Sequence, residues 1–493
     1  MTAKEGADAQ EGAADAAEQH ESGDPARTGA HAERGDAVGS SKPSGILDVL
    51  RDRFCQFDRR MLGIFRLCFG SLLLADLLRR VPDATFFYSN EGVLSNHLAL
   101  FAPLGKPYFS LFSAFSTPAE VKLAMFGMAV AYAFYLVGYR TKVFQILAFV
   151  LFTSLNARNI FLENGGCVVM AMLAGWTMFL PLGDRFSVDA VVRSLRARDD
   201  RTVATLNERA DIEPDRSPFH SIVGVGIVIE IAAIYFFNAV HKLGATWRDG
   251  EAIHWVLWQN RIATTWAGWL RMHEPSWLSP VVTKLTVWVE GLMALLAVSP
   301  VFQRQARVAL FAFAVVLHLG IALFLTLGPF SYAMVALTML LLPRSVFDAG
   351  AAWLGRRRVA CEVVYDGSDS GLHLVARILA RLDVFQAITF SDSRGAAGPS
   401  DRPAASFAAR RDVGSWVVGS SAIVLAMRSL PLGGLLGGLF GNAAGAALLR
   451  AVLRRREHLA EVFLLAPASA PGSLPAFVLA DPAPPWREQL DGT

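Results

Sequence analysis

Charged side chains are scarce in this sequence of 493 residues. They make up 18% of the chain, while 53% of its residues are apolar. The mean hydropathy is +0.38. Soluble globular domains carry about 25% charged residues, so this composition predicts a membrane protein. The formal net charge of +3 says little about partners, and we expect none among nucleic acids.

Cysteine is also scarce. The four cysteines, Cys55, Cys68, Cys167 and Cys361, are scattered, with no CxxC pair and no spacing typical of zinc ligands. The sequence therefore predicts neither a disulfide framework nor a metal site. The first residues lack a basic segment followed by an apolar one, so we expect no cleavable signal peptide and expect the first hydrophobic helix to direct insertion.

Large apolar residues are nearly missing from the N-terminal end of the chain. Residues 1–45 are rich in Ala, Gly, Glu, Asp and Ser, which predicts a disordered acidic tail. Residues 467–493 are rich in Pro and Ala and are predicted to form a flexible tail. Residues 46–60 are typical of a short amphipathic segment that lies on the membrane surface.

Long apolar runs recur between residues 46 and 345. A helix needs about 20 apolar residues to cross about 30 Å of hydrocarbon. Eight runs are candidates: 61–79, 119–138, 143–162, 166–182, 220–241, 281–299, 307–326 and 328–343. The last is short, so the final two could equally be one span and a re-entrant segment. We therefore expect an α-helical polytopic domain of about eight transmembrane helices.

The distribution of basic residues predicts the orientation. Lys and Arg collect in cytoplasmic loops. With a cytoplasmic N-terminus, every inside segment is basic, and the outside loops carry fewer basic residues, Arg79 and Arg80 being the exception. We therefore expect a protein of the inner cell membrane with both termini in the cytoplasm. This orientation places Lys242 at the outer face.

The two long outside segments, 80–118 and 242–280, are rich in aromatic residues. Trp and Tyr prefer the headgroup level of a bilayer, so we expect half-buried helices that roof the bundle. One interpretation is an aromatic belt. The other is that some of these rings line the opening for a lipid-like substrate.

Five ionisable side chains fall inside the predicted spans. A charged side chain there costs about 2.5–3.5 kcal/mol, which makes each one a candidate for function. Four of them, Arg66, Asp76, Glu230 and Glu290, are interpreted as structural groups that form ion pairs between helices. The fifth is His318, which alone would more often be a hydrogen-bonded interior histidine than a catalyst.

The end of the fifth predicted span changes character abruptly. Asn238, His241 and Lys242 follow a purely apolar stretch, and Trp247 comes next. Asn238 and Lys242 are four residues apart and share a helix face. Glu230 lies about 18 Å before Lys242 along a helix, too far to be its direct partner. The lysine is either a membrane anchor or a base.

The chemistry of such a lysine depends on its burial. A lysine in water has a pKa of about 10.4 and is protonated, so it cannot act as a base. Burial can lower the pKa of an amine by several units and leave it neutral. The alternative is a side chain that snorkels to water from the helix end.

Four sequence blocks resemble the horizontally transferred transmembrane (HTTM) family, bacterial relatives of vitamin K-dependent gamma-glutamyl carboxylase. They are FRLCFGSLLLAD with Arg66 and Asp76; the stretch from Asn164 through GGCVV to PLGDRFSVDA; VHKLGATWRDGEAI with Lys242 and Trp247; and HLGIALFLTLGPFSY with His318. The blocks lie in the family's order, and together they carry the resemblance.

The resemblance implies a catalytic site. In the carboxylase, the matching lysine deprotonates vitamin K hydroquinone, and the matching histidine lies in the same membrane site. It therefore implies Lys242 and His318 as catalytic residues and a reduced, vitamin K-like quinone as co-substrate. Substrate contacts are expected from Asn238, His241, Trp247 and Asn164.

The carboxylase has a large luminal β-rich region that this sequence lacks. A peptidyl-glutamate carboxylase of that kind is therefore not expected. A quinone, a lipid or a small peptide is left as the substrate.

Residues 359–466 have the composition of a soluble domain, and alternating strand and helix patterns predict a small α/β fold. VVYDGSDSGLHLVARIL resembles the DCC family of thioredoxin-like proteins. At the positions of the two motif cysteines stand Asp369 and Leu372. Thiol–disulfide exchange needs two thiols, so the resemblance implies a redox-dead interaction domain.

Two functions follow from these patterns. One is a membrane enzyme that acts on a quinone or lipid-like molecule with Lys242 as base. The alternative is a non-catalytic membrane scaffold that docks a protein partner through its redox-dead cytoplasmic domain. A transporter is less well supported, since the sequence has no inverted repeat and no paired broken helices.

Overall fold

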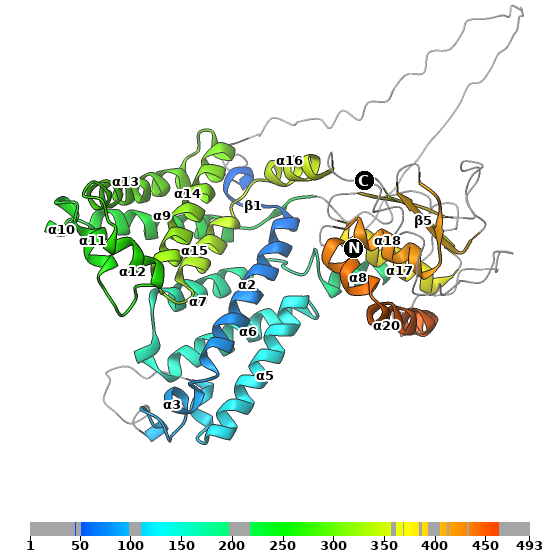
Figure 1. Cartoon of the computed structure of the whole chain (residues 1–493), viewed down its shortest axis with the longest axis horizontal. Coiled ribbons are helices and arrows are strands. Elements are labelled where there is room, and N and C mark those ends of the chain that lie inside the picture. The colour runs from blue at the N-terminus through cyan, green and yellow to red at the C-terminus, as the bar shows by residue number, and fades with distance from the viewer. Residues whose placement is uncertain are drawn as a thin grey trace, which may run out of the picture. The chain divides into compact units, whose positions relative to one another are not determined.

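The computed structural model describes residues 45, 51–97, 110–196, 217–355, 361–367, 369–383, 387–392, 405–411, 414–430 and 433–462. The predicted tails, 1–45 and 467–493, lie outside this part of the chain except for Gly45, as does the beginning of the predicted surface segment, 46–50. The described residues form a mostly helical protein with a small C-terminal sheet (Figure 1). The expectation of a mostly helical chain with a small C-terminal α/β region is confirmed.

Five helices are long and apolar enough to cross a membrane. They are α2 (Arg59–Arg80), α5 (Pro118–Val137), α9 (Val223–His241), α13 (Leu278–Val298) and α14 (Gln303–Phe324). In the most apolar part of each, between 22% and 56% of the residues are buried inside the protein. Large apolar side chains such as Phe126 and Trp288 therefore face outward, as expected of helices that contact lipid.

The other three predicted spans are helical but shorter. α6 (Thr141–Arg158), α7 (Gly165–Thr177) and α15 (Phe330–Met339) have 18, 13 and 10 residues. At 1.5 Å per residue, the last two reach only about 20 and 15 Å. After a bend of 95°, α15 is followed by α16 (Arg344–Gly355). The described helices thus include five candidate spans. Up to seven are possible if two bent pairs, α15 with α16 and Gly433–Gly441 with Ala443–Arg454, are each counted as one span.

The starts of α2 and α9 lie at the same end of the helical region. The strand β1 (Gln56–Phe57), just before α2, pairs antiparallel with β2 (Phe219–His220), just before α9. The turn between α13 and α14 joins them, because Arg53 donates to the Pro300 carbonyl and Arg307 to the Arg53 carbonyl. We call this end, which also carries Arg59 and Arg60, the basic end.

Arg66, in the second turn of α2, ties further segments to the basic end. Its guanidinium donates to the carbonyls of Leu136, Leu182, Arg185 and Phe186. Gly138 ends α5 in the left-handed conformation (φ 73°), and a Cβ there would lie 2.4 Å from the Arg66 guanidinium. Glycine is therefore required both by the backbone and by the close approach.

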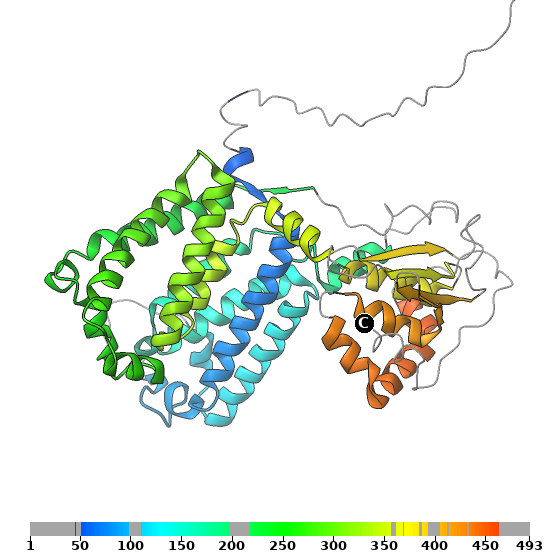
Figure 2. The ribbon, with the colours of Figure 1, turned by 45° about the horizontal axis from the view of Figure 1, so that its top comes forward.

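Short helices occupy the opposite end. They are α3 (Ala84–Tyr88), the 3-10 turns η1 (Leu111–Ala114) and η2 (Ile160–Leu162), and α10 (Ala245–Arg248), α11 (Ala252–Leu257) and α12 (Thr265–Met272). α11 packs against α13, and α12 against α14 (Figure 2). The expected roof helices are present, but Trp266, Trp269 and Trp277 are each 58–60% exposed. Residues 98–109 of the first aromatic segment lie outside the described residues.

The C-terminal domain contains a four-stranded sheet in the order β4-β3-β5-β6. Its elements are β3 (Cys361–Tyr365), α17 (Ser370–Leu382), β4 (Ile388–Asp392), β5 (Phe407–Arg411), β6 (Val417–Val418), α18 (Ser420–Arg428), α19 (Gly433–Gly441), α20 (Ala443–Arg454) and α21 (Arg456–Val462). β3 and β4 are parallel, whereas β5 is antiparallel to both β3 and β6. The predicted strand–helix–strand alternation is present.

Candidate functional site

Lys242 lies directly after the last residue of α9, where it is the C-cap. Its ammonium group donates a hydrogen bond to the Glu290 carboxylate of α13, the helix that packs against α9. The side chains of Lys242 and Glu290 are only 16% and 9% exposed. The lysine therefore turns inward to a carboxylate instead of extending to water.

Trp247 of α10 lies beside this ion pair. The Lys242 ammonium is 5.1 Å from the centre of the indole ring, within the range of a cation–π contact. The structure thus brings together two of the expected site residues, Lys242 and Trp247. It adds Glu290, which the sequence had indicated only as a structural group.

A second buried pair involves Tyr235, which lies on α9 seven residues before Lys242. The Tyr235 hydroxyl of α9 is 2.9 Å from Nε2 of His318 in α14. Both residues are buried, and the Phe330 ring lies edge-on to the imidazole, with its centre 5.5 Å away. Among the described residues, Nδ1 of His318 has no hydrogen-bond partner. A buried polar atom without a partner is costly, which marks this position as a candidate for ligand contact.

The two pairs belong to one cluster. Both pairs start from α9, where Tyr235 and Lys242 are seven positions apart, and their partners lie on α13 and α14, which pack against each other. We call Tyr235, Lys242, Glu290 and His318 the polar cluster. It joins α9, α13 and α14 at the end opposite the basic end. An amine, a carboxylate, an imidazole and a phenol in one apolar setting can bind and transfer protons.

Asn238 and His241 are not part of this cluster. Asn238 is exposed, and the exposed His241 ring stacks on Phe237 at 5.7 Å between centres. The expected shared face of Asn238 and Lys242 fails because Lys242 leaves the helical path, with ψ at 49°. Its side chain then leads toward α13, while Asn238 faces outward.

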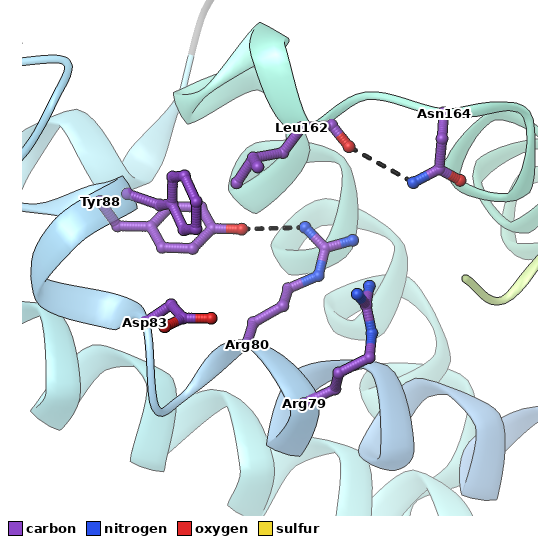
Figure 3. Close-up of a pocket in the computed structure, with 7 residues that line it drawn as sticks. Arg79, Arg80, Asp83, Tyr88, Leu162 and Asn164 are labelled. Carbon is purple, nitrogen blue, oxygen red and sulfur yellow. Dashed lines mark hydrogen bonds between the residues drawn. The ribbon is translucent and has the colours of Figure 1, made fainter. Parts of the chain in front are cut away.

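Asn164 has a local structural role and lines a separate pocket. It caps α7, since its side-chain oxygen accepts from the backbone N–H groups of Gly166 and Cys167 at 2.9 and 3.2 Å. The pocket measures about 100 Å³ (Figure 3). It is lined by Arg79, Arg80, Asp83, Phe87, Tyr88, Leu162 and Asn164.

The turn before α15 lies between this pocket and His318. A Cβ on Gly328 would lie 3.8 Å from the Asn164 amide nitrogen and 3.9 Å from the Arg79 guanidinium. A Cβ on Gly166 would lie 2.5 Å from the Phe330 backbone nitrogen. Phe330 therefore packs on α7 on one side and on the imidazole on the other.

Three of the four expected structural groups have partners other than an ion pair between helices. Arg66 is surrounded by the carbonyls described above. Asp76 accepts from Arg79 and Arg80 of its own helix, each at 2.8 Å. Glu230 is buried beside Trp176 of α7. Only Glu290 forms the expected pair between helices. The prediction was wrong for Arg66 and Asp76 because backbone carbonyls and adjacent helical turns supply closer partners.

In the C-terminal domain, the two motif positions are occupied by structural side chains. Asp369 caps α17 by accepting from the backbone N–H groups of Gly371 and Leu372 at 2.9 and 3.0 Å, and it pairs with Arg456 at 2.9 Å. Leu372 is fully buried in the core. Cys361 is buried, and burial raises the pKa of its thiol to about 11. This arrangement has no nucleophilic thiol pair among the described residues.

The described part of the chain contains no set of side chains that could bind a metal ion. No group of three His, Cys, Asp or Glu side chains there could hold a metal ion. No family model, curated protein or solved structure matches the chain. Inference about function therefore starts from the geometry of the polar cluster.

Proposed function

We propose that this chain is a membrane enzyme that binds a reduced quinone or a similar lipid-like molecule and deprotonates it with Lys242. One observation carries the proposal: α9 holds two buried polar pairs, Lys242 with Glu290 of α13 and Tyr235 with His318 of α14, and α13 packs against both other helices. Ionisable groups at such a depth are costly, and a purely structural role does not need four of them. The HTTM resemblance points to the same lysine and histidine.

Glu290 gives Lys242 a route to the neutral amine. In a medium of low dielectric constant, two separated charges are penalised, and moving one proton from the ammonium to the carboxylate yields a neutral pair. The neutral amine can then accept the proton of a substrate hydroxyl, which leaves an oxyanion beside the new ammonium. Trp247 covers the ammonium and stabilises this charged state.

The imidazole supplies the second contact. When the Tyr235 hydroxyl donates to Nε2 of His318, the neutral ring carries its proton on Nδ1, the atom without a partner. That N–H can donate to an oxygen of the ligand. A hydroquinone has a hydroxyl for Lys242 and a second oxygen for His318. The Phe330 ring beside the imidazole adds apolar surface next to this contact.

The same proposal includes a bundle of about eight spans in the inner membrane, with both termini in the cytoplasm. Its support is the shared start of α2 and α9, which requires an even number of crossings by α2, α5, α6 and α7. The short helices α6 and α7 can cross where the bilayer thins locally or where neighbouring helices bury their ends. The basic end then faces the cytoplasm.

A second function, a membrane scaffold, is favoured by one observation in the C-terminal domain. The positions of the two motif cysteines hold a helix-capping aspartate and a core leucine. A strand, a helix and a parallel strand, followed by an antiparallel pair and a helix, support a thioredoxin-like fold of the DCC type. Such a domain without thiols would bind a partner protein and carry out no exchange.

The test is mass spectrometry of the quinones and lipids that co-purify with the full chain. We expect a bound quinone or similar lipid with the wild type and its loss with Lys242→Ala. Lys284→Ala is the matched control, since Lys284 is an exposed lysine on α13 near the same end, and it should retain the ligand. Equal amounts of ligand in wild type and Lys242→Ala would refute the role of Lys242. The scaffold alternative predicts instead that deletion of residues 359–493 abolishes the cellular phenotype.

A further inference from the structure

Helices α19 and α20 in the C-terminal domain present an exposed apolar face. On α19, Leu435 and Leu439 are 71% and 55% exposed. On α20, Leu448 and Val452 are 59% and 46% exposed. In each helix the two side chains are four residues apart, so they lie on one face. Leaving four large apolar side chains in water on adjacent helices is unfavourable, which marks the surface as a binding site.

The neighbouring face of α20, about 100° around the helix, belongs to the domain core. Leu449 and Leu453 are 7% and 2% exposed and pack in the same cluster as the sheet. The two helices are bent by 89° at their junction. With 9 and 12 residues, each is also too short to cross a bilayer alone. The core contacts of α20 therefore hold the pair to the domain, and neither helix alone is long enough to be a span.

The charged residues of α20 itself are all arginines, whereas the exposed Glu457 and Glu461 follow on α21. Between Arg428 and Arg456 the sequence contains no Asp and no Glu. Arg454 and Arg455 are exposed at the end of α20, next to Val452. Exposed apolar side chains flanked by arginines are typical of helices that lie in the interface of an anionic membrane.

The chain length keeps this domain near a membrane. Helix α16 is tied to the start of α2, because Arg60 donates to Asp348 at 2.9 Å and stacks over Phe347. α16 ends at Gly355, and β3 begins at Cys361. A fully extended chain of that length reaches about 20 Å. The domain therefore remains close to the membrane face at the basic end of the helices.

We propose that the α19–α20 face binds the anionic surface of the membrane that the apolar helices cross. Leu435, Leu439, Leu448 and Val452 enter the boundary between headgroups and acyl chains, and Arg454 and Arg455 pair with lipid phosphates. In the proposed orientation, on which this step rests, the basic end faces the cytoplasmic leaflet, where anionic lipids gather. This binding is independent of the proposed enzymatic role of Lys242.

The test uses the full chain in nanodiscs, with Cys68→Ser as background because Cys68 is the only exposed cysteine among the described residues. A fluorophore is attached through Leu439→Cys, and its quenching by a water-soluble quencher is compared in neutral and anionic lipid. We expect protection in anionic lipid. The same label on Val418→Cys, an exposed strand position, should be quenched equally in both lipids.

A variant separates electrostatics from mere proximity. The double substitution Arg454→Ser with Arg455→Ser should lower the apparent affinity of the face for anionic lipid by about 30-fold. The label should then be less protected from the quencher. A Leu439 label that stays fully quenched in anionic nanodiscs would overturn the proposal. So would protection that persists in detergent and grows with protein concentration, because a second copy would then occupy the face.

Discussion

Lys242 and Glu290 are 48 residues apart in the chain and share a hydrogen bond between the end of α9 and the middle of α13. A snorkelling lysine would extend its ammonium into water, but this one is 84% covered and meets a carboxylate. Lys242 is therefore a buried, ion-paired lysine and not a surface anchor.

Breaking the Lys242–Glu290 pair should destabilise the protein. Glu290→Leu and Lys242→Met each leave one charge without its partner, which costs about 3–5 kcal/mol for a buried pair. The double substitution Lys242→Met with Glu290→Leu should recover most of that loss. Thermal unfolding in detergent measures the coupling, with Lys284→Met as control. If the loss in the double variant equals the sum of the two single losses within about 0.5 kcal/mol, the two residues do not interact.

Removing the Tyr235 hydroxyl should isolate its bond to His318. Tyr235→Phe leaves Nε2 of the buried imidazole without a partner, at a cost of about 1–3 kcal/mol. Tyr332→Phe is the matched control, since Tyr332 is 51% exposed on α15 and its change should be near neutral. The comparison is made by thermal unfolding of the two variants. Equal stability of the two would contradict a hydrogen bond at Tyr235.

The apolar runs predicted the helix positions well because hydrophobic length is a local property. The run at 61–79 corresponds to Arg59–Arg80, and the run at 281–299 to Leu278–Val298. The fourth run was predicted to extend to 182 but ends at Thr177. There the chain turns, and the Leu182 carbonyl accepts from Arg66. This contact is non-local, and no sequence pattern indicates it.

The candidate site was predictable only in part for the same reason. Lys242 and Trp247 were indicated by the block VHKLGATWRDGEAI. His318 was indicated by the cost of placing an ionisable side chain inside a predicted span. Tyr235 was not, because one tyrosine in an apolar helix has no signal of its own. Glu290 was recognised as costly, but its partner depends on how α9 packs against α13. Asn238 was misplaced because the helix ends before Lys242.

The contact of α7 with the turn before α15 should depend on the absence of a side chain at one position. Gly166→Ala places a Cβ 2.5 Å from the Phe330 backbone nitrogen, so one of the two segments must move. We expect a loss of about 1–3 kcal/mol in unfolding free energy. Gly165→Ala is the control, because its Cβ would meet the Phe330 ring at 3.6 Å, an ordinary contact. Equal stabilities of the two variants would mean that α7 and α15 do not approach closely.

Cys361 should be almost inert toward thiol reagents in the folded protein. Its thiol is 1% exposed, and burial raises its pKa to about 11. At pH 8 only about 0.1% of it is thiolate, the reactive form. In the Cys68→Ser background, Val418→Cys supplies an exposed thiol of ordinary pKa, about 8.5, which should be alkylated quickly. Mass spectrometry locates the label, and rapid modification of Cys361 at pH 8 would show that the core of the domain opens.

Asp369 should contribute to the stability of the C-terminal domain through its cap more than through its charge. Asp369→Ala removes the acceptor for two backbone N–H groups at the start of α17, at a cost of about 0.5–2 kcal/mol. Asp369→Asn keeps a capping oxygen and loses only the ion pair with Arg456, worth about 0.2–1 kcal/mol. Hydrogen exchange of the α17 amides in the two variants measures the difference. If Asp369→Asn destabilised α17 as much as Asp369→Ala, the carboxylate charge and not the cap would hold this position.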